Sequence, residues 1–169
     1  MDIVKVILTG IGLLVFQLIL APSLSVENIA YPAPYVLFWL LLPFSWSPWT
    51  VGALAISYGA LMDILFPPHG LQTFCGLWIM ALRKLIFRIS HPNLPPEWEL
   101  NTSLYHLTLG EFFLYAFPLT LLHHMWYFPL AAWEVSWVVF FRAGLSTTYT
   151  LLWEWIIFVI ALQQRHVRS

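Results

Sequence analysis

Apolar residues run through this chain in long stretches, separated by short breaks at proline, glycine or charged residues. A helix needs about 20 mainly apolar residues to cross a membrane, and six stretches come near that length. The pattern therefore predicts one domain, residues 1–169, folded as an all-α bundle of about six transmembrane helices. Their expected bounds are Ile3–Ala21, Ile29–Trp46, Pro48–Phe66, Gly70–Phe87, Leu104–Phe128 and Trp137–Leu162.

The composition favours the same class of protein. Of the 169 residues, 60% are hydrophobic, 18% are aromatic and 9% are charged, so polar surface could not cover this chain in water. A formal net charge of −1 offers no basic surface for nucleic acid, and a single cysteine excludes an intramolecular disulfide framework. The first stretch ends in LILAPS, without the A-x-A pattern of a cleavable signal, and is expected to remain as a helix.

The basic residues indicate how the bundle is oriented. With six spans both termini lie on one side, and six of the seven Lys and Arg residues fall there: Lys5, Arg83, Lys84, Arg88, Arg165 and Arg168. The positive-inside rule makes that side cytoplasmic. Because Arg83, Lys84 and Arg88 end the fourth stretch, their side chains are expected to extend to the lipid headgroups.

Four ionisable residues fall inside the predicted spans: Asp63, Glu111, Arg142 and Glu154. A charge at the bilayer centre costs about 2.5–3.5 kcal/mol on insertion scales, so each of them needs a partner or a wet cavity. Asp63 and Arg142 fall in the outer leaflet with opposite charges, which suggests an ion pair between the third and sixth spans. The alternative is that Asp63 contacts a partner subunit directly.

Two helix faces stand out by their spacing. In the third span, residues three or four apart place Gly52, Ala55, Gly59 and Asp63 on one face, and the small ones allow another backbone to come close. In the sixth span, polar residues recur every fourth position: Arg142, Ser146, Thr150 and Glu154. This polar stripe is expected to face the bundle interior rather than lipid.

The acids Glu111 and Glu154 lie at similar distances from the cytoplasmic ends of the fifth and sixth spans. Two acids at one depth suggest a proton or cation site. The structural alternative is that burial keeps one of them protonated, or that Arg83 or Lys84 reaches one of them. Neither a metal-binding spacing of His and Cys nor a nucleophile motif occurs, so we expect no metal, no cofactor and no enzyme activity.

Two stretches in order, PAPYVLFWLLLPF (residues 32–44) and GALMDILFPPHGLQTF (residues 59–74), resemble the rod shape-determining MreD family of bacteria. The similar features are a proline-flanked second span ending in L-L-P, then G-x-x-x-D closing the third span and a glycine shortly after. The positions that match are Pro43, Gly59, Asp63 and Gly70, and the resemblance implies an architectural rather than catalytic role for them. Length, number of spans and basic cytoplasmic edges are also similar.

The resemblance implies a multi-pass protein of the bacterial inner membrane, in the complex that elongates rod-shaped cells. Its partners would be the bitopic protein MreC and, beyond it, MreB filaments, RodA and penicillin-binding protein 2, in addition to the lipid bilayer. Family members are similar in fold to the substrate-binding subunits of energy-coupling-factor transporters. Two functions follow as expectations: a non-catalytic scaffold that binds MreC, or a subunit that binds a vitamin-like small molecule for a transporter.

Overall fold

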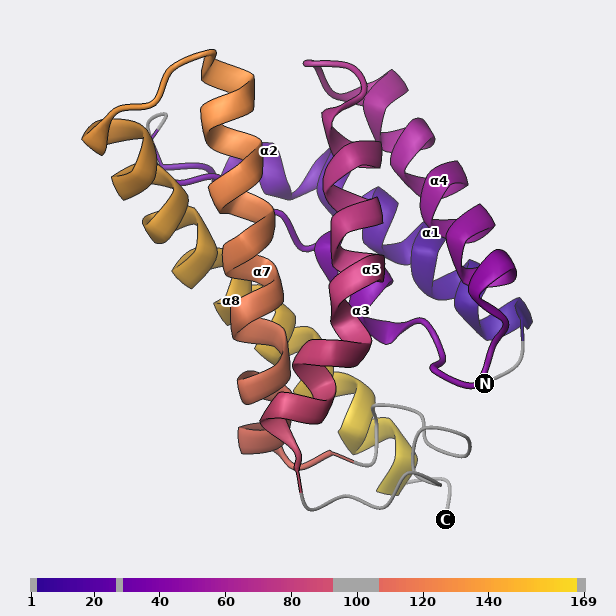
Figure 1. Cartoon of the computed structure of the whole chain (residues 1–169). Helices are drawn as coiled ribbons and strands as arrows, with labels where there is room; N and C mark the ends of the chain where they lie inside the picture. Colours follow the sequence, from indigo (N-terminus) through magenta and orange to yellow (C-terminus); the bar gives the residue numbers. More distant parts are fainter. Residues whose placement is uncertain (1–2, 27–28, 93–106, 167–169) are drawn as a thin grey trace.

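The apolar stretches fold as helices of very different length (Figure 1). The computed structural model describes residues 3–26, 29–92 and 107–166, and these form seven α-helices. Five are long and two are short: α1 (Ile3–Ile19), α2 (Ala21–Leu24), α3 (Val36–Leu41), α4 (Pro48–Leu65), α5 (Leu71–Ser90), α7 (Leu109–Ala132) and α8 (Trp137–His166). The predicted all-α class is confirmed.

Two segments of the described chain, Pro48–Leu65 and Trp137–Ile160, are helices long and apolar enough to cross a membrane, and the apolar helix Ile3–Ile19 is shorter. Local chemistry sets where the first of these begins. The Ser47 side chain accepts a hydrogen bond from the Thr50 N–H at 3.1 Å, and Pro48 occupies the first helical position. Both are favoured helix-start features, because they leave fewer backbone N–H groups without a partner.

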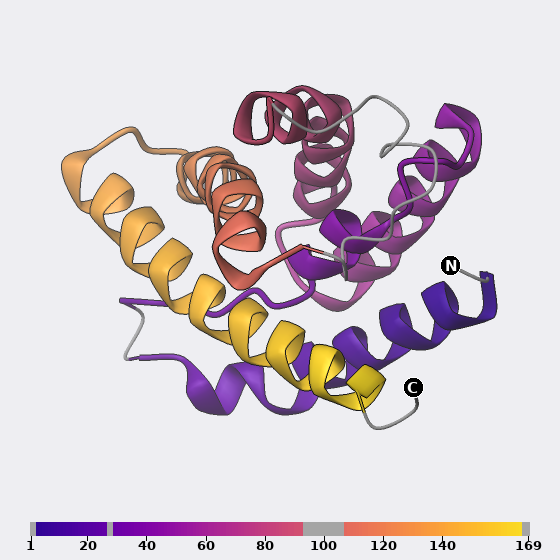
Figure 2. The same cartoon turned by 90° about the horizontal axis from the view of Figure 1, so that it is seen from below.

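Neighbouring long helices pack against one another: α4 on α5, α5 on α7, and α7 on α8. The α4–α5 and α7–α8 connections lie together at one end of the molecule, the upper end in Figure 1. Viewed from below, α8 and α1 lie along one side of the molecule, and α5 and α7 lie along the other (Figure 2). Between these layers lies α3, which contacts α1, α5 and α7 and has all six residues buried.

The second predicted span, Ile29–Trp46, is wrong as a continuous helix. Only α3 within it is helical, about 9 Å at 1.5 Å per residue, and that length cannot cross a bilayer. The segment before α3 is non-helical: a bridge joins Val26 and Ala30, residues 31–33 have no regular structure, and Pro34 and Tyr35 form a turn. Pro32 and Pro34 explain the difference, because proline lacks an N–H and keeps the residue before it out of the helical conformation. Residues 32–44 are nonetheless buried throughout.

Small residues of α4 pack against other parts of the protein in its interior. A Cβ atom at Gly59 would lie 2.6 Å from the Cα atom of Thr73, so α4 and α5 meet at backbone distance there. Ala55 is fully buried as well, whereas a Cβ atom at Gly52 would meet nothing within 4 Å. The predicted face of Gly52, Ala55 and Gly59 is therefore not free for a partner helix, except at Gly52.

Candidate functional site

Asp63, near the end of α4, binds the first turn of α5. Its carboxylate accepts hydrogen bonds from the backbone N–H of Gln72 at 2.8 Å, and from the N–H and hydroxyl of Thr73 at 3.0 and 2.6 Å. These are the second and third residues of α5, where an N-cap side chain normally binds. The residue at the N-cap position itself is Gly70, which has no side chain and a left-handed φ of 92°.

The predicted ion pair between Asp63 and Arg142 is not formed, because α5 already satisfies the carboxylate. Among the described residues no salt bridge or hydrogen bond joins the two side chains, and Asp63 is 7% exposed. The positive end of the α5 dipole, rather than Arg142, supplies the favourable electrostatic environment of this carboxylate. The sequence correctly placed a partner at this acid but named the wrong one.

Arg83 of α5 is the largest departure from the sequence-based expectation. Its side chain is 2% exposed instead of extending to lipid headgroups, and it donates hydrogen bonds to three backbone carbonyls at the end of α3. The acceptors are Trp39 at 3.3 Å, Leu42, and Pro43 at 3.0 Å. The guanidinium also lies 4.7 Å from the ring centroid of Phe44, a cation–π distance. Arg83 therefore caps a helix that ends inside the protein.

The polar stripe of α8 faces the interior, as predicted: Ser146, Thr150 and Glu154 are all fully buried. Ser146 accepts a hydrogen bond from the Tyr31 N–H at 3.0 Å, and Thr150 accepts one from the Ala33 N–H at 2.9 Å. These hydroxyls replace the helical hydrogen bonds that the non-helical segment before α3 lacks. A backbone group that is shielded from water must be satisfied within the protein, and side chains of α8 do this here.

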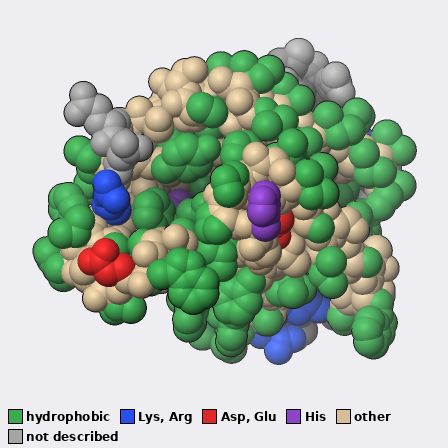
Figure 3. Space-filling view, turned by 90° about the horizontal axis from the view of Figure 1, so that it is seen from above, with side chains coloured by type: hydrophobic (Ala, Val, Ile, Leu, Met, Phe, Trp, Pro, Cys, Tyr) green, Lys and Arg blue, Asp and Glu red, His purple; other side chains and the backbone are tan. Residues whose placement is uncertain are grey.

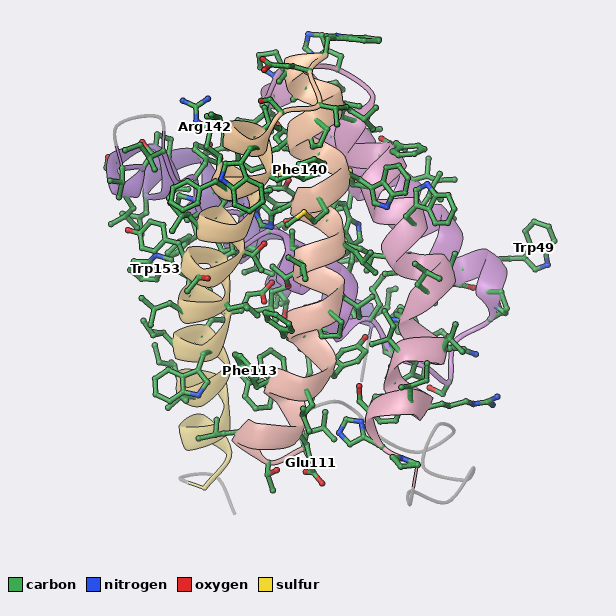
Figure 4. All side chains as sticks on the ribbon, turned by 60° about the vertical axis from the view of Figure 1, so that its left-hand side comes forward. Trp49, Glu111, Phe113, Phe140, Arg142 and Trp153 are labelled. Carbon is green, nitrogen blue, oxygen red and sulfur yellow. The ribbon has the colours of Figure 1, made fainter. Side chains whose placement is uncertain are left out.

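Glu111 and Glu154 do not share a depth. Glu111 forms a capping box with Thr108 at the start of α7, where the Thr108 N–H and hydroxyl each donate to Glu111 Oε2 at 2.8 Å. Glu154 instead accepts from the Thr120 hydroxyl at 3.1 Å. Thr120 lies nine residues further along α7, about 14 Å at 1.5 Å per residue. Glu111 is visible at the lower end of α7 in Figure 4, and the predicted two-acid site is wrong.

A cavity of about 650 Å³ lies at the upper end of the molecule, where α1, α2, α5, α7, α8 and the non-helical segment before α3 converge. Figure 3, which looks down on this end, shows the surface hollowed beside a basic side chain. Of the predicted polar stripe only Arg142 lines this cavity, and it lies near the upper end of α8 in Figure 4. The other polar lining residues are Gln17, Ser25, Tyr31, Tyr35, Gln72 and Tyr127.

A second hollow, a groove of about 710 Å³, is lined almost entirely by apolar residues of α7 and α8, together with Val26, Ile29 and Ala30, and is called here the α7–α8 groove. Phe113 and Phe117 contribute from α7, and Leu145, Leu152 and Trp155 from α8. Except for Leu145, these side chains are 41–50% exposed. The polar Thr148 also lines the groove, and its hydroxyl is satisfied by the Gly144 carbonyl of its own helix at 3.2 Å.

Sequence reasoning missed three residues of these sites: Gln17, Gln72 and Thr120. Each is a polar side chain in an apolar stretch, and each is buried with a defined hydrogen-bond role. Searching for uncharged polar residues in the predicted spans, as well as charged ones, could have found them. No family model, curated protein or solved structure matches this chain, so its function is inferred from its own residues and their geometry.

Proposed function

We propose that this protein is a non-catalytic scaffold subunit of the bacterial cell-elongation complex, similar to MreD, and that it binds the transmembrane helix of MreC. It would be a multi-pass protein of the inner membrane with both termini cytoplasmic. Binding to MreC would connect it with the other members of the complex: MreB filaments, RodA and penicillin-binding protein 2. The resemblance of residues 32–44 and 59–74 to the MreD family motivates the proposal.

The single observation that carries the contact is the apolar groove along α7 and α8. Six residues of α8 line it: Leu145, Thr148, Tyr149, Leu151, Leu152 and Trp155. All of them except Leu151 follow spacings of three and four that form one helix ridge. From the first to the last of these positions α8 rises about 15 Å, half the hydrocarbon thickness of a bilayer. One apolar helix from a bitopic partner suits this surface, because ridge-into-groove packing needs contiguous exposed side chains rather than polar groups.

Motif residues support a scaffold role by what they contact. Asp63, Gly59 and Gly70 fix α5 on α4, and the Pro43 carbonyl binds Arg83. All four matching positions thus act on the internal packing of the molecule. A partner helix would pack instead on the exposed apolar side chains of the α7–α8 groove, none of which belongs to these motif positions.

The test is cysteine cross-linking with the MreC of the same organism. The single native cysteine, Cys75, is 1% exposed, so an introduced cysteine at Leu152 would supply the accessible thiol in the groove. We expect Leu152→Cys to form a disulfide with a cysteine scanned along the MreC transmembrane helix, at positions repeating every three to four residues. Ile64→Cys on α4, where the native side chain is 75% exposed, is the matched control and should not cross-link.

Cross-linking of Ile64→Cys with equal yield, or of neither variant, would contradict this docking surface. Depletion of the protein should also make a rod-shaped host round. A host that keeps its shape, combined with purification free of MreC, would contradict the scaffold function itself.

A further inference from the structure

We propose that the upper cavity binds a small organic anion that carries an aromatic ring. The cavity and the α7–α8 groove share Ile29 and Ala30, but Arg142 and the other polar residues named above line only the cavity. The proposal concerns the chain alone rather than its complex with a partner. Its volume of about 650 Å³ is within the usual range of small-molecule sites, about 300–1,000 Å³. Every long helix except α4 contributes a lining residue, and Phe66 and Pro67 follow directly after α4.

The charge of the ligand follows from Arg142. It is the only charged side chain among the residues that line the cavity, and its guanidinium has no hydrogen bond or ion pair to any other described residue. Asp63 does not line the cavity, and its carboxylate is occupied by the first turn of α5. A guanidinium binds carboxylate and phosphate groups through two parallel hydrogen bonds, which gives both affinity and orientation.

The ring of the ligand follows from the remaining lining. Five aromatic side chains surround the space: Tyr31, Tyr35, Phe66, Tyr127 and Phe128. Aromatic side chains offer flat apolar faces for an offset-stacked or edge-on ring. A purely aliphatic ligand would leave that geometry unused, and a bare inorganic anion would leave most of the volume empty.

Polar groups in the lining are held in place before any ligand arrives. The Tyr35 hydroxyl bonds with Gln72 Oε1, and it lies 2.9 Å from His123 Nε2. Gln17 is 1% exposed, and its Nε2 donates to the Tyr31 hydroxyl at 3.2 Å. Its Oε1 has no partner among the described residues, so a buried acceptor beside the cavity is left for a donor.

Phosphate on an aromatic group and phosphate in a lipid headgroup share the chemistry that Arg142 would recognise, so the experiment separates these sources. The purified chain is placed in phosphatidylcholine nanodiscs and titrated with phenyl phosphate, inorganic phosphate or benzyl alcohol, with thermal unfolding and intrinsic fluorescence as readouts. We expect the dissociation constant of phenyl phosphate to be at least tenfold lower than that of either single-feature probe.

Variants of Arg142 test the assigned contact. Arg142→Ala is expected to raise the dissociation constant of phenyl phosphate at least tenfold and Arg142→Lys to raise it less, because lysine keeps the charge without the planar fork. The ligand-free unfolding temperature should stay the same, since this side chain makes no hydrogen bond to another described residue. Lys84→Ala, an exposed cation outside the cavity, is the matched control and should bind like the native chain.

Replacing phosphatidylcholine by anionic phosphatidylglycerol then identifies the source. If the lipid competes with phenyl phosphate in the native chain but not in Arg142→Ala, a headgroup phosphate without a ring occupies the site, and the aromatic ligand is refuted. If the lipid does not compete, the natural ligand of this site is a soluble aromatic anion. A dissociation constant that Arg142→Ala leaves within twofold of the native value, or equal binding of all three probes, would overturn the proposal.

Discussion

Removing the Asp63 carboxylate should separate the start of α5 from α4, and the expected loss can be worked from the three hydrogen bonds it accepts. A hydrogen bond to a charged group contributes about 1.5–3 kcal/mol, and loss of a helix cap costs about 0.5–2 kcal/mol. The three bonds involve only two residues, and the half-buried Thr73 can bond with water after the substitution. We therefore expect Asp63→Ala to lower the free energy of unfolding by about 3 kcal/mol.

The graded variant Asp63→Asn sharpens this prediction. Its amide oxygen can still accept from Gln72 and its amide nitrogen can donate to the Thr73 hydroxyl, so only the bond from the Thr73 N–H is lost, at a cost of about 1–1.5 kcal/mol. Reversible unfolding in mixed micelles measures the loss, and hydrogen exchange at residues 72–73 locates it. Glu134→Gln, at an exposed acid between α7 and α8, is the control.

Asp63→Ala within about 0.5 kcal/mol of the native chain, with unchanged exchange at residues 72–73, would refute the capping role. The same experiment addresses the pair expected from the sequence. Because no contact joins Asp63 and Arg142, Arg142→Ala should leave the loss from Asp63→Ala unchanged in a double-mutant cycle. A coupling energy above about 0.5 kcal/mol would instead restore the ion pair.

Three further tests of the packing, two of them with a matched control substitution, use the same unfolding assay. Gly59→Ala should destabilise the protein by about 1–3 kcal/mol, because the added Cβ atom would lie 2.6 Å from the backbone of α5. Gly52→Ala is the control and should stabilise the protein by about 0.5–1 kcal/mol, because its Cβ atom would meet nothing within 4 Å. Equal effects of the two substitutions would contradict the close approach of α4 and α5. Arg83→Met should cost at least about 3 kcal/mol by leaving three carbonyls without a donor, and a neutral effect would remove the capping role. Thr150→Val should lower the free energy of unfolding by about 1–2 kcal/mol, because the Thr150 hydroxyl accepts a hydrogen bond from the Ala33 N–H. The control Thr148→Val should lower it by under about 0.5 kcal/mol, because the exposed Thr148 hydroxyl bonds only within its own helix. A larger loss from Thr148→Val than from Thr150→Val would contradict the contact with Ala33.

Apolar periodicity and length were enough to predict where most helices lie. The third predicted span, Pro48–Phe66, matches α4 within one residue at its end, because Ser47, Pro48 and the prolines after the helix are local signals. The interior direction of the α8 stripe was also predictable, since a polar residue at every fourth position of an apolar helix is costly on a lipid face. Such features depend on residues close in sequence.

Contacts between distant segments could not be predicted in the same way. The partner of Asp63 is a helix terminus, which carries no charged residue that a sequence would reveal. Arg83 looked like a headgroup anchor because it adjoins Lys84, and nothing local indicates that a helix ends beside it. The groove and the cavity arise from the angles between helices, and apolar pattern does not determine those angles.

The break in the second apolar stretch explains why this molecule has polar groups at its centre. A non-helical segment has N–H groups without helical partners, and a short helix has free carbonyls; in a bilayer neither could bond with water. Ser146 and Thr150 of α8 accept hydrogen bonds from N–H groups of the segment before α3. Arg83 of α5 donates hydrogen bonds to the carbonyls at the end of α3. Since each contribution comes from a different helix, α3 can be satisfied only once α5 and α8 have packed. The segment that runs into α3 also brings Tyr31 and Tyr35 to the upper cavity, which makes that cavity a consequence of the same break.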